Sequence, residues 1–379
     1  MTTLSHKDRL QRHLAGQEVD RIPALGGWML GVENLATLAG ITVADYLRDP
    51  LRGVVRANQA LGVDALVSPV VPTDIHSIRG GALEEQNFAG REPEELQQRA
   101  DQIPDTEAGV LAAFDPAATR QHYLKWFTDL RGQLDGLEFF PNDWGAPANF
   151  SLYFQYGYEA FLAAVALYPV AVGKIYWQDG LLARERNKIV VQLMRELDVL
   201  PVMFTGHDIC INDGPMCSPE FLRQYYWPHA KTSLTPFVEA GIRVICHCDG
   251  NVMPLIDDML GAGFSGFQGF QYECGVDPRA IRQRRSAQGE ELLLMAGLSV
   301  TRTLPFGTIA ELETEVDYLL DVTAGGRGMF LISSNVIGVE VPPAKVRAAY
   351  DYLARFDPRR PYRPNPALQR WPWIVAHPQ

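Results

Sequence analysis

Short apolar runs alternate along this chain with longer stretches in which apolar residues recur at helical spacing. Eight of the short runs have the length and composition of buried strands. They are Ile22–Gly26, Ala65–Val71, Leu137–Pro141, Pro201–Gly206, Arg243–His247, Ser265–Phe270, Leu292–Gly297 and Met329–Ser333. The longer patterns predict helices over Val43–Leu61, Tyr158–Leu197, Pro219–Ala240, Val252–Ala262, Ile309–Thr323 and Pro342–Arg355. Ser218 before Pro219, and Thr308 before Ile309, are typical helix N-caps.

This alternation predicts an α/β fold, and its eight strands favour a (β/α)8 TIM barrel in which residues 1–379 form a single domain. An open doubly wound sheet is the rival, but no G-x-G-x-x-G follows the early strands. Residues 73–134 are longer than one βα unit and predict an insertion near the barrel mouth, with helices over Glu92–Ala100 and Asp115–Leu134. The Pro-rich tail, residues 357–379, is predicted to wrap the outside of the barrel.

The charge balance excludes some partners. The 34 basic and 45 acidic residues give a formal net charge of -11, which argues against nucleic acid or an anionic membrane surface as the main partner. The first residues are charged and lack the apolar segment of a secretory signal. The longest apolar run, Phe161–Val172, contains Pro169 and is shorter than the roughly 20 residues of a membrane span. We therefore expect a cytoplasmic, soluble protein that acts on a small-molecule substrate.

Five cysteines lie between Cys210 and Cys274. An odd number in a chain of this size does not suggest a disulfide framework. The clustering permits a metal-binding or thiol role, but small buried side chains are the preferred interpretation for Cys210, Cys217 and Cys246.

Polar residues at the ends of the predicted strands are candidates for chemistry, because barrel active sites lie where strands end and βα loops begin. Three histidines at these ends each lie within two residues of an aspartate, in the pairs Asp74 and His76, His207 and Asp208, and His247 and Asp249. An imidazole beside a carboxylate can orient a tautomer, transfer a proton or bind a cation. Each has a structural alternative: His76 can be a loop residue, His207 a buried hydrogen-bonded group, and Asp249 a helix cap.

The spacing around His247 suggests a metal site. His247 and Asp249 are two residues apart at a strand end and therefore point to the same side, whereas Cys248 points away. Glu273, after the next strand, completes a candidate three-ligand site. Such a set accepts several divalent metals, so zinc is one option among others.

Three segments carry a resemblance to a known family: Gly206–Glu220, His247–Val252 and Tyr272–Asp277. With Gly338–Pro342 and the helix after it, they resemble the uroporphyrinogen decarboxylase superfamily, which implies a (β/α)8 barrel. True uroporphyrinogen decarboxylases carry an Arg-Gln-Ala-Gly-Arg type segment after the first strand, and here Arg21–Leu30 has no cation after Arg21. A tetra-acidic porphyrinogen needs several cationic contacts, so the chain is more similar to the cobamide-dependent methyltransferases of the superfamily.

That resemblance implies methyl transfer between a small methylated substrate, such as a methyl ether, and a cobamide carried by a partner protein. In the branch with a thiol acceptor, the ligand positions match His247, Asp249, Glu273 and Asn335, so that two thiolates are replaced here by oxygen ligands. A bound metal, or protonated His207 backed by Asp208, would assist the leaving atom. The candidate substrate-binding residues are Trp28, Asp74, His76, Trp144, Tyr226 and Asn335.

Two alternatives remain open at this point. One is a decarboxylase or related lyase acting on a non-porphyrin acid. The other is a non-catalytic barrel whose site has drifted.

Overall fold

The structure is a computed structural model that describes residues 3–75 and 90–377. Its strands are β1 (Leu25–Gly26), β2 (Ala65–Leu66), β3 (Glu138–Phe139), β4 (Val202–Gly206), β5 (Cys210–Ile211), β6 (Gly214–Pro215), β7 (Arg243–His247), β8 (Gly266–Gln268), β9 (Leu293–Leu298) and β10 (Met329–Ser333). Each of the eight predicted strand ranges overlaps one of them. The hairpin of β5 and β6 was not predicted.

The helices up to the middle of the chain are α1 (His6–Leu14), α2 (Val32–Ala39), α3 (Val43–Arg48), α4 (Pro50–Ala60), α5 (Glu94–Asp101), α6 (Glu107–Leu111), α7 (Pro116–Gln133), α8 (Tyr153–Tyr156), α9 (Tyr158–Leu167) and α10 (Pro169–Glu196). The later ones are α11 (Pro219–Phe221), α12 (Trp227–Glu239), α13 (Ile256–Ala262), α14 (Pro278–Arg282), α15 (Thr303–Phe306), α16 (Ile309–Val322), α17 (Pro343–Ala354) and α18 (Pro372–Ala376). A π-helix over Leu222–Tyr226 joins α11 to α12, and 3₁₀ turns cover Met253–Leu255 and Tyr272–Cys274.

Prolines divide two of the predicted helices. The pattern over Val43–Leu61 becomes α3 and α4, because Pro50 starts a new helix that Asp49 caps by accepting the Arg52 backbone N–H. The pattern over Tyr158–Leu197 becomes α9 and α10, which meet at 110° before Pro169. The predicted caps are confirmed: Ser218 accepts the Phe221 N–H, and Thr308 forms a capping box with Glu311.

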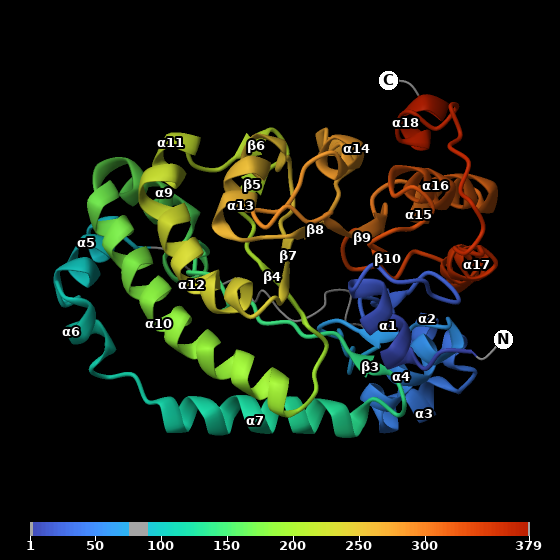
Figure 1. The fold of residues 1–379 in the computed structure, drawn as a ribbon, viewed down its shortest axis with the longest axis horizontal. Coiled ribbons are helices and arrows are strands. Elements are labelled where there is room, and N and C mark those ends of the chain that lie inside the picture. Colours follow the sequence, from blue (N-terminus) through green and yellow to red (C-terminus); the bar gives the residue numbers. More distant parts are fainter. Residues whose placement is uncertain (1–2, 76–89, 378–379) are drawn as a thin grey trace.

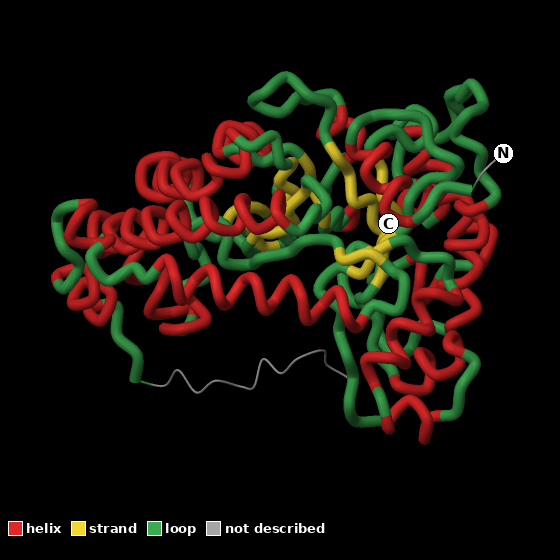
Figure 2. The backbone as a smooth tube through the Cα atoms, turned by 60° about the horizontal axis from the view of Figure 1, so that its bottom comes forward, coloured by secondary structure: helices red, strands yellow, loops and turns green. Residues whose placement is uncertain are grey.

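Two parallel sheets form the centre of the molecule, with helices around them (Figures 1 and 2). One sheet has the order β1-β2-β3 and the other β10-β9-β8-β7-β4. The edges of the two sheets meet twice, through parallel bridges between Ala24 and Leu331 and between Asn142 and Phe204. The fold is therefore α/β with parallel sheets, as the alternation predicted.

Alternate strand residues pack into two separate apolar cores. One core collects side chains from both sheets, including Leu25, Val202, Ile245, Leu293 and Phe330. The other residues of the same strands face the helices and join the larger core. His247 continues the row of Ile245, two residues further along β7, and therefore follows directly on the core that both sheets share.

The predicted insertion contains α5, α6 and α7, and all three pack against α10. The tail is held by Trp371, which stacks on Tyr272 and donates its indole N–H to Glu315. Among the described residues, no single helix is long and apolar enough to cross a membrane. The bent pair α9 and α10 reaches that length and apolarity only when its two helices are taken together.

Candidate metal centre

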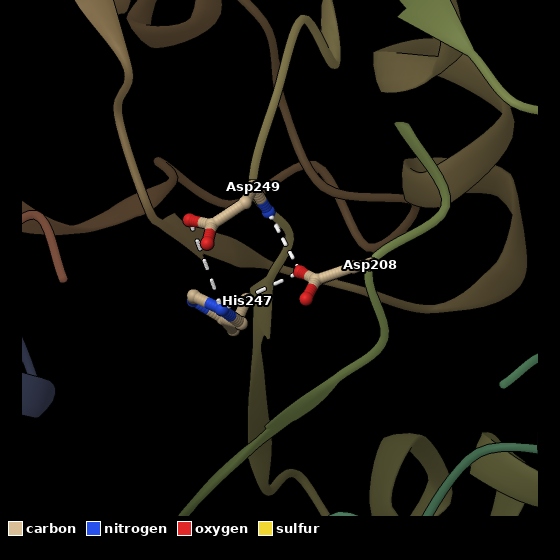
Figure 3. A group of neighbouring side chains, drawn as sticks. All are labelled: Asp208, His247 and Asp249. Carbon is tan, nitrogen blue, oxygen red and sulfur yellow. Dashed lines mark hydrogen bonds and ion pairs between the residues drawn. The ribbon is translucent and has the colours of Figure 1, made fainter. Parts of the chain in front are cut away.

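Three side chains from two neighbouring strand ends converge on one point. Asp208, His247 and Asp249 each offer a ligand atom within 4.8 Å of the others, and their side chains point toward one another (Figure 3). His247 Nε2 lies 3.6 Å from Asp208 Oδ1 and 3.9 Å from Asp249 Oδ1. We call these three residues the Asp–His–Asp cluster.

The ends of β4 and β7 bring the cluster together. The two strands are parallel, and Gly206 at the end of β4 pairs in register with His247. Gly206 has a φ of +146°, and a Cβ there would lie 2.0 Å from the His247 carbonyl oxygen, so only glycine allows this close approach. The chain then turns so that Asp208 Oδ1 accepts the backbone N–H of Asp249 at 3.0 Å.

His247 is buried and held on several sides. Its Nδ1 is 2.5 Å from Gln268 Oε1, and the strand register places these two residues side by side on β7 and β8. The indole rings of Trp28 and Trp144 lie nearly perpendicular to the imidazole, with centroids 5.7 Å and 5.6 Å away. Trp28 is buried, whereas Trp144 is 39% exposed.

Asp249 has one satisfied and one unsatisfied oxygen. Its Oδ2 accepts the amide of Asn335 at 2.6 Å, and its buried Oδ1 has no hydrogen-bond partner among the described residues. Burial raises the pKa of Asp249 to about 6, and the charges of Asp208 and Glu273 add to the increase, while His247 and Asn335 oppose it. Asp249 caps neither the 3₁₀ turn nor α13, so its role as a helix cap is not seen here.

The other predicted ligand, Glu273, lies outside the Asp–His–Asp cluster. It follows β8 in a 3₁₀ turn, and its Oε1 accepts the hydroxyl of Thr301. Asp208 therefore occupies the third place that the sequence assigned to Glu273. The cause is local: the turn after β8 directs the Glu273 carboxylate toward Thr301.

His207 is half-buried and is not part of the cluster. Its Nδ1 bonds to Ser151 Oγ at 3.0 Å, and its Nε2 has no partner among the described residues. Burial lowers the pKa of His207 to about 4 despite the charge of Asp208, so this imidazole is neutral near pH 7. No hydrogen bond joins it to the Asp208 carboxylate in the described part of the chain, and the predicted His207 and Asp208 pair is not formed.

The remaining predicted residues are dispersed. Tyr226 is buried in the π-helix, where it packs against Phe150 and Tyr176 and donates its hydroxyl to the Ala148 carbonyl. Asp74 is exposed. His76 lies outside the described residues. Cys248 is buried in the larger core, on the side away from His247, as alternation along the strand predicted.

Gln268 was not among the predicted site residues, although it contacts His247. A polar residue at the end of an otherwise apolar strand was the available signal, but its contact with His247 depends on the register between β7 and β8.

A hollow of about 590 Å³ lies at the opposite ends of the strands, lined by residues such as Arg243, Leu292 and Gly328. These residues precede or start β7, β9 and β10. Arg243 and Glu290 form an ion pair across it, and it contains none of the predicted site residues. In barrels of parallel strands, residues at that end usually contribute to stability, and the chemistry takes place at the other end.

These observations define a class: an α/β protein with parallel sheets and a group of potential metal ligands at the carboxyl ends of two strands. One solved structure of similar fold is a methyltransferase from Methanosarcina mazei, with a TM-score of 0.59 and 16% sequence identity. The similarity covers 93% of this chain and 99% of that one, so the likeness extends over the whole fold. No protein-family model matches the sequence, and no curated protein matches it either.

Proposed function

We propose that this protein is a methyltransferase that moves a methyl group between a small methylated substrate, such as a methyl ether, and a cobamide carried by a partner protein. The convergence of Asp208, His247 and Asp249 at the ends of β4 and β7 is the observation that carries the proposal. The fold likeness to a methyltransferase supports it.

The cluster suits a divalent cation such as zinc. Ligand atoms bound to tetrahedral zinc at ~2.0–2.2 Å lie about 3.3–3.6 Å from one another. The two distances from His247 Nε2, 3.6 and 3.9 Å, are within a few tenths of an ångström of that range. Two carboxylates beside one imidazole leave an excess of negative charge, and Asp249 Oδ1 has no hydrogen-bond partner among the described residues, so a cation would satisfy it. Three protein ligands would leave a coordination position for substrate.

When bound, such a metal would act as a Lewis acid on the heteroatom that leaves the methyl group. The residues of the chain would do the positioning. Asn335 holds the Asp249 carboxylate through a 2.6 Å hydrogen bond. Trp28 and Trp144 restrain the His247 ring, and the exposed part of Trp144 would form one wall of the substrate site. Because the His207 imidazole is neutral near pH 7, we assign it no proton-donor role.

We further propose that the two sheets form one closed (β/α)8 barrel. The bridges at both sheet edges and the core shared by both sheets support this arrangement. The Asp–His–Asp cluster would then lie above the inner core at the carboxyl ends of the strands, where barrel enzymes place their chemistry.

The test is an anaerobic assay of methyl transfer. Purified, zinc-loaded protein is incubated with free cob(I)alamin and isotope-labelled methyl donors, in separate reactions for methyl ethers, methylated amines and methylated thiols. We expect label to reach the cobamide from one donor class, with loss of activity by about 100-fold or more in His247→Ala. The control is Asp213→Asn, which removes an exposed carboxylate from the turn between β5 and β6.

Two results would contradict the proposal. Release of carbon dioxide from a carboxylic acid substrate, without methyl transfer, would identify the protein as a lyase. A protein that binds no metal and transfers no methyl group from any donor class would be a barrel without this catalytic function.

A further inference from the structure

Gln268 is a buried polar residue whose amide orientation is determined by its partners. Its Nε2 donates to two backbone carbonyls at the end of β10, those of Ser333 at 3.1 Å and Ser334 at 2.8 Å. The side chain is 3% exposed, so water does not replace these partners. An amide turned the other way would place its oxygen against two carbonyl oxygens and leave all three without a donor. The amide oxygen therefore faces His247.

This orientation determines which nitrogen of His247 carries hydrogen. Gln268 Oε1 can only accept, and it lies 2.5 Å from His247 Nδ1. Nδ1 must therefore be the donor, and in the neutral imidazole the lone pair is left on Nε2. Nε2 is the atom that faces Asp208 Oδ1 and Asp249 Oδ1.

We infer that Gln268 is the positioning residue that holds neutral His247 in its Nδ1–H tautomer, so that the free lone pair of Nε2 points into the Asp–His–Asp cluster. The consequence for metal affinity rests on the proposed function, but the tautomer itself does not. Without Gln268, the two nearby carboxylates would favour a hydrogen on Nε2, which is the form that cannot bind a metal.

The neighbouring residues hold the imidazole ring of His247 in this orientation. Trp28 and Trp144 contact it nearly at right angles, so a ring rotated out of its present plane would lose both packing contacts. The backbone after Gln268 also passes close by: a Cβ on Gly269 would lie 3.3 Å from His247 Nδ1. A ring turned by 180° would place a carbon atom against Gln268 Oε1 and lose the hydrogen bond.

The first experiment measures the tautomer in metal-free protein. Histidine is labelled with ¹⁵N, metal is removed with a chelator, and spectra are recorded near pH 8.5, about two units above the ordinary histidine pKa. The His247 signals are assigned by their absence in His247→Ala. We expect the Nδ1–H tautomer to dominate in the wild type, and a dominant Nε2–H tautomer would overturn the inference.

Variants separate this role from simple packing. Gln268→Leu keeps the size but removes the acceptor, so the Nε2–H tautomer should become the major form. Gln268→Glu keeps an acceptor oxygen beside Nδ1 and should retain Nδ1–H, at a cost in stability because its second oxygen faces the Ser333 and Ser334 carbonyls. The matched control is Ser265→Ala, which removes another buried side-chain hydrogen bond, to Val244 N, beside the same strand and should leave the tautomer unchanged. An unchanged tautomer in Gln268→Leu would refute the positioning role. If that variant does not fold, the spectra of the wild type and Gln268→Glu decide.

The second experiment titrates each protein with Zn²⁺ against a chromogenic chelator. We expect Gln268→Leu to bind Zn²⁺ about 10–100-fold more weakly than wild type, and Ser265→Ala to bind it equally well. Absence of Zn²⁺ binding by the wild type would contradict the proposed function, while the tautomer measurement in metal-free protein would still decide the role of Gln268. Equal Zn²⁺ affinity in wild type and Gln268→Leu would contradict the inference alone.

Discussion

The buried carboxyl of Glu315 makes a quantitative prediction about stability and pH. Glu315 lies on α16, is 1% exposed, and accepts hydrogen bonds from the backbone of Ser299 and the indole of Trp371 in the tail. Burial raises its pKa from the ordinary 4.5 to about 7, although these hydrogen bonds lower it. Ionised Glu315 is thus disfavoured in the folded protein.

The size of the effect follows from the difference in pKa between the folded and unfolded states. Each pKa unit corresponds to about 1.4 kcal/mol, so a shift of this size gives roughly 3 kcal/mol. Because the folded pKa is raised, this contribution to stability is fully present below pH 4.5, is lost as the pH rises through 7, and does not change further above about pH 8.

Glu315→Gln removes the ionisation and should remove this dependence. We expect the free energy of unfolding of Glu315→Gln, relative to wild type, to increase by about 3 kcal/mol between pH 4 and pH 8. Urea unfolding followed by tryptophan fluorescence measures it. The control, Asp45→Asn, removes an exposed carboxylate in the first turn of α3, whose hydrogen bonds with Thr42 and Arg48 lower its pKa. The difference in free energy of unfolding between this control and the wild type should be constant above pH 6. A constant difference for Glu315→Gln over the whole range would refute the reasoning.

Three further predictions concern the fold and the cluster. Asp64→Asn should destabilise the protein by about 3–5 kcal/mol in urea unfolding, because a fully buried carboxylate pairs there with Arg9 and Arg21; a loss below about 1 kcal/mol would contradict this. Gly206→Ala should lower the free energy of unfolding by about 2 kcal/mol or more and should lower Zn²⁺ affinity. Gly214 has a similar φ of +141° but open space around it, so Gly214→Ala should destabilise the protein less and leave Zn²⁺ affinity unchanged. Asn335→Leu should weaken Zn²⁺ binding about 10-fold by freeing one carboxylate of the Asp–His–Asp cluster, and unchanged affinity in a chelator competition assay would exclude that role.

Much of the fold could be predicted because its signals are local. Each predicted strand was a short apolar run, and each overlaps a strand in the structure. The boundaries were less predictable, because pairing with neighbours decides how much of a run joins a sheet. Ile22–Gly26 shortens to β1, and the helix predicted over Tyr158–Leu197 breaks before Pro169. The hairpin of β5 and β6 did have a signal, the turn residues Asn212-Asp213-Gly214.

In the candidate site, too, some features follow from a local sequence pattern and others do not. Alternation along β7 was enough to predict that His247 and Asp249 face one side, and the strand-end position of Asn335 brings it to Asp249. The choice of Asp208 over Glu273 could not be made, because it depends on the path of the chain after each strand ends. The partner of His247 Nδ1 depends on the register between β7 and β8, two strands that are separated in the sequence by a helix.

The most direct test of the central claim is to locate the metal. Crystals of the protein loaded with Zn²⁺ should show one strong anomalous peak at the zinc edge, within about 2.0–2.2 Å of His247 Nε2 and of one oxygen each from Asp208 and Asp249. The same experiment on His247→Ala should show no peak there. A peak elsewhere in the wild type, or no peak among these three side chains at saturating Zn²⁺, would contradict the account.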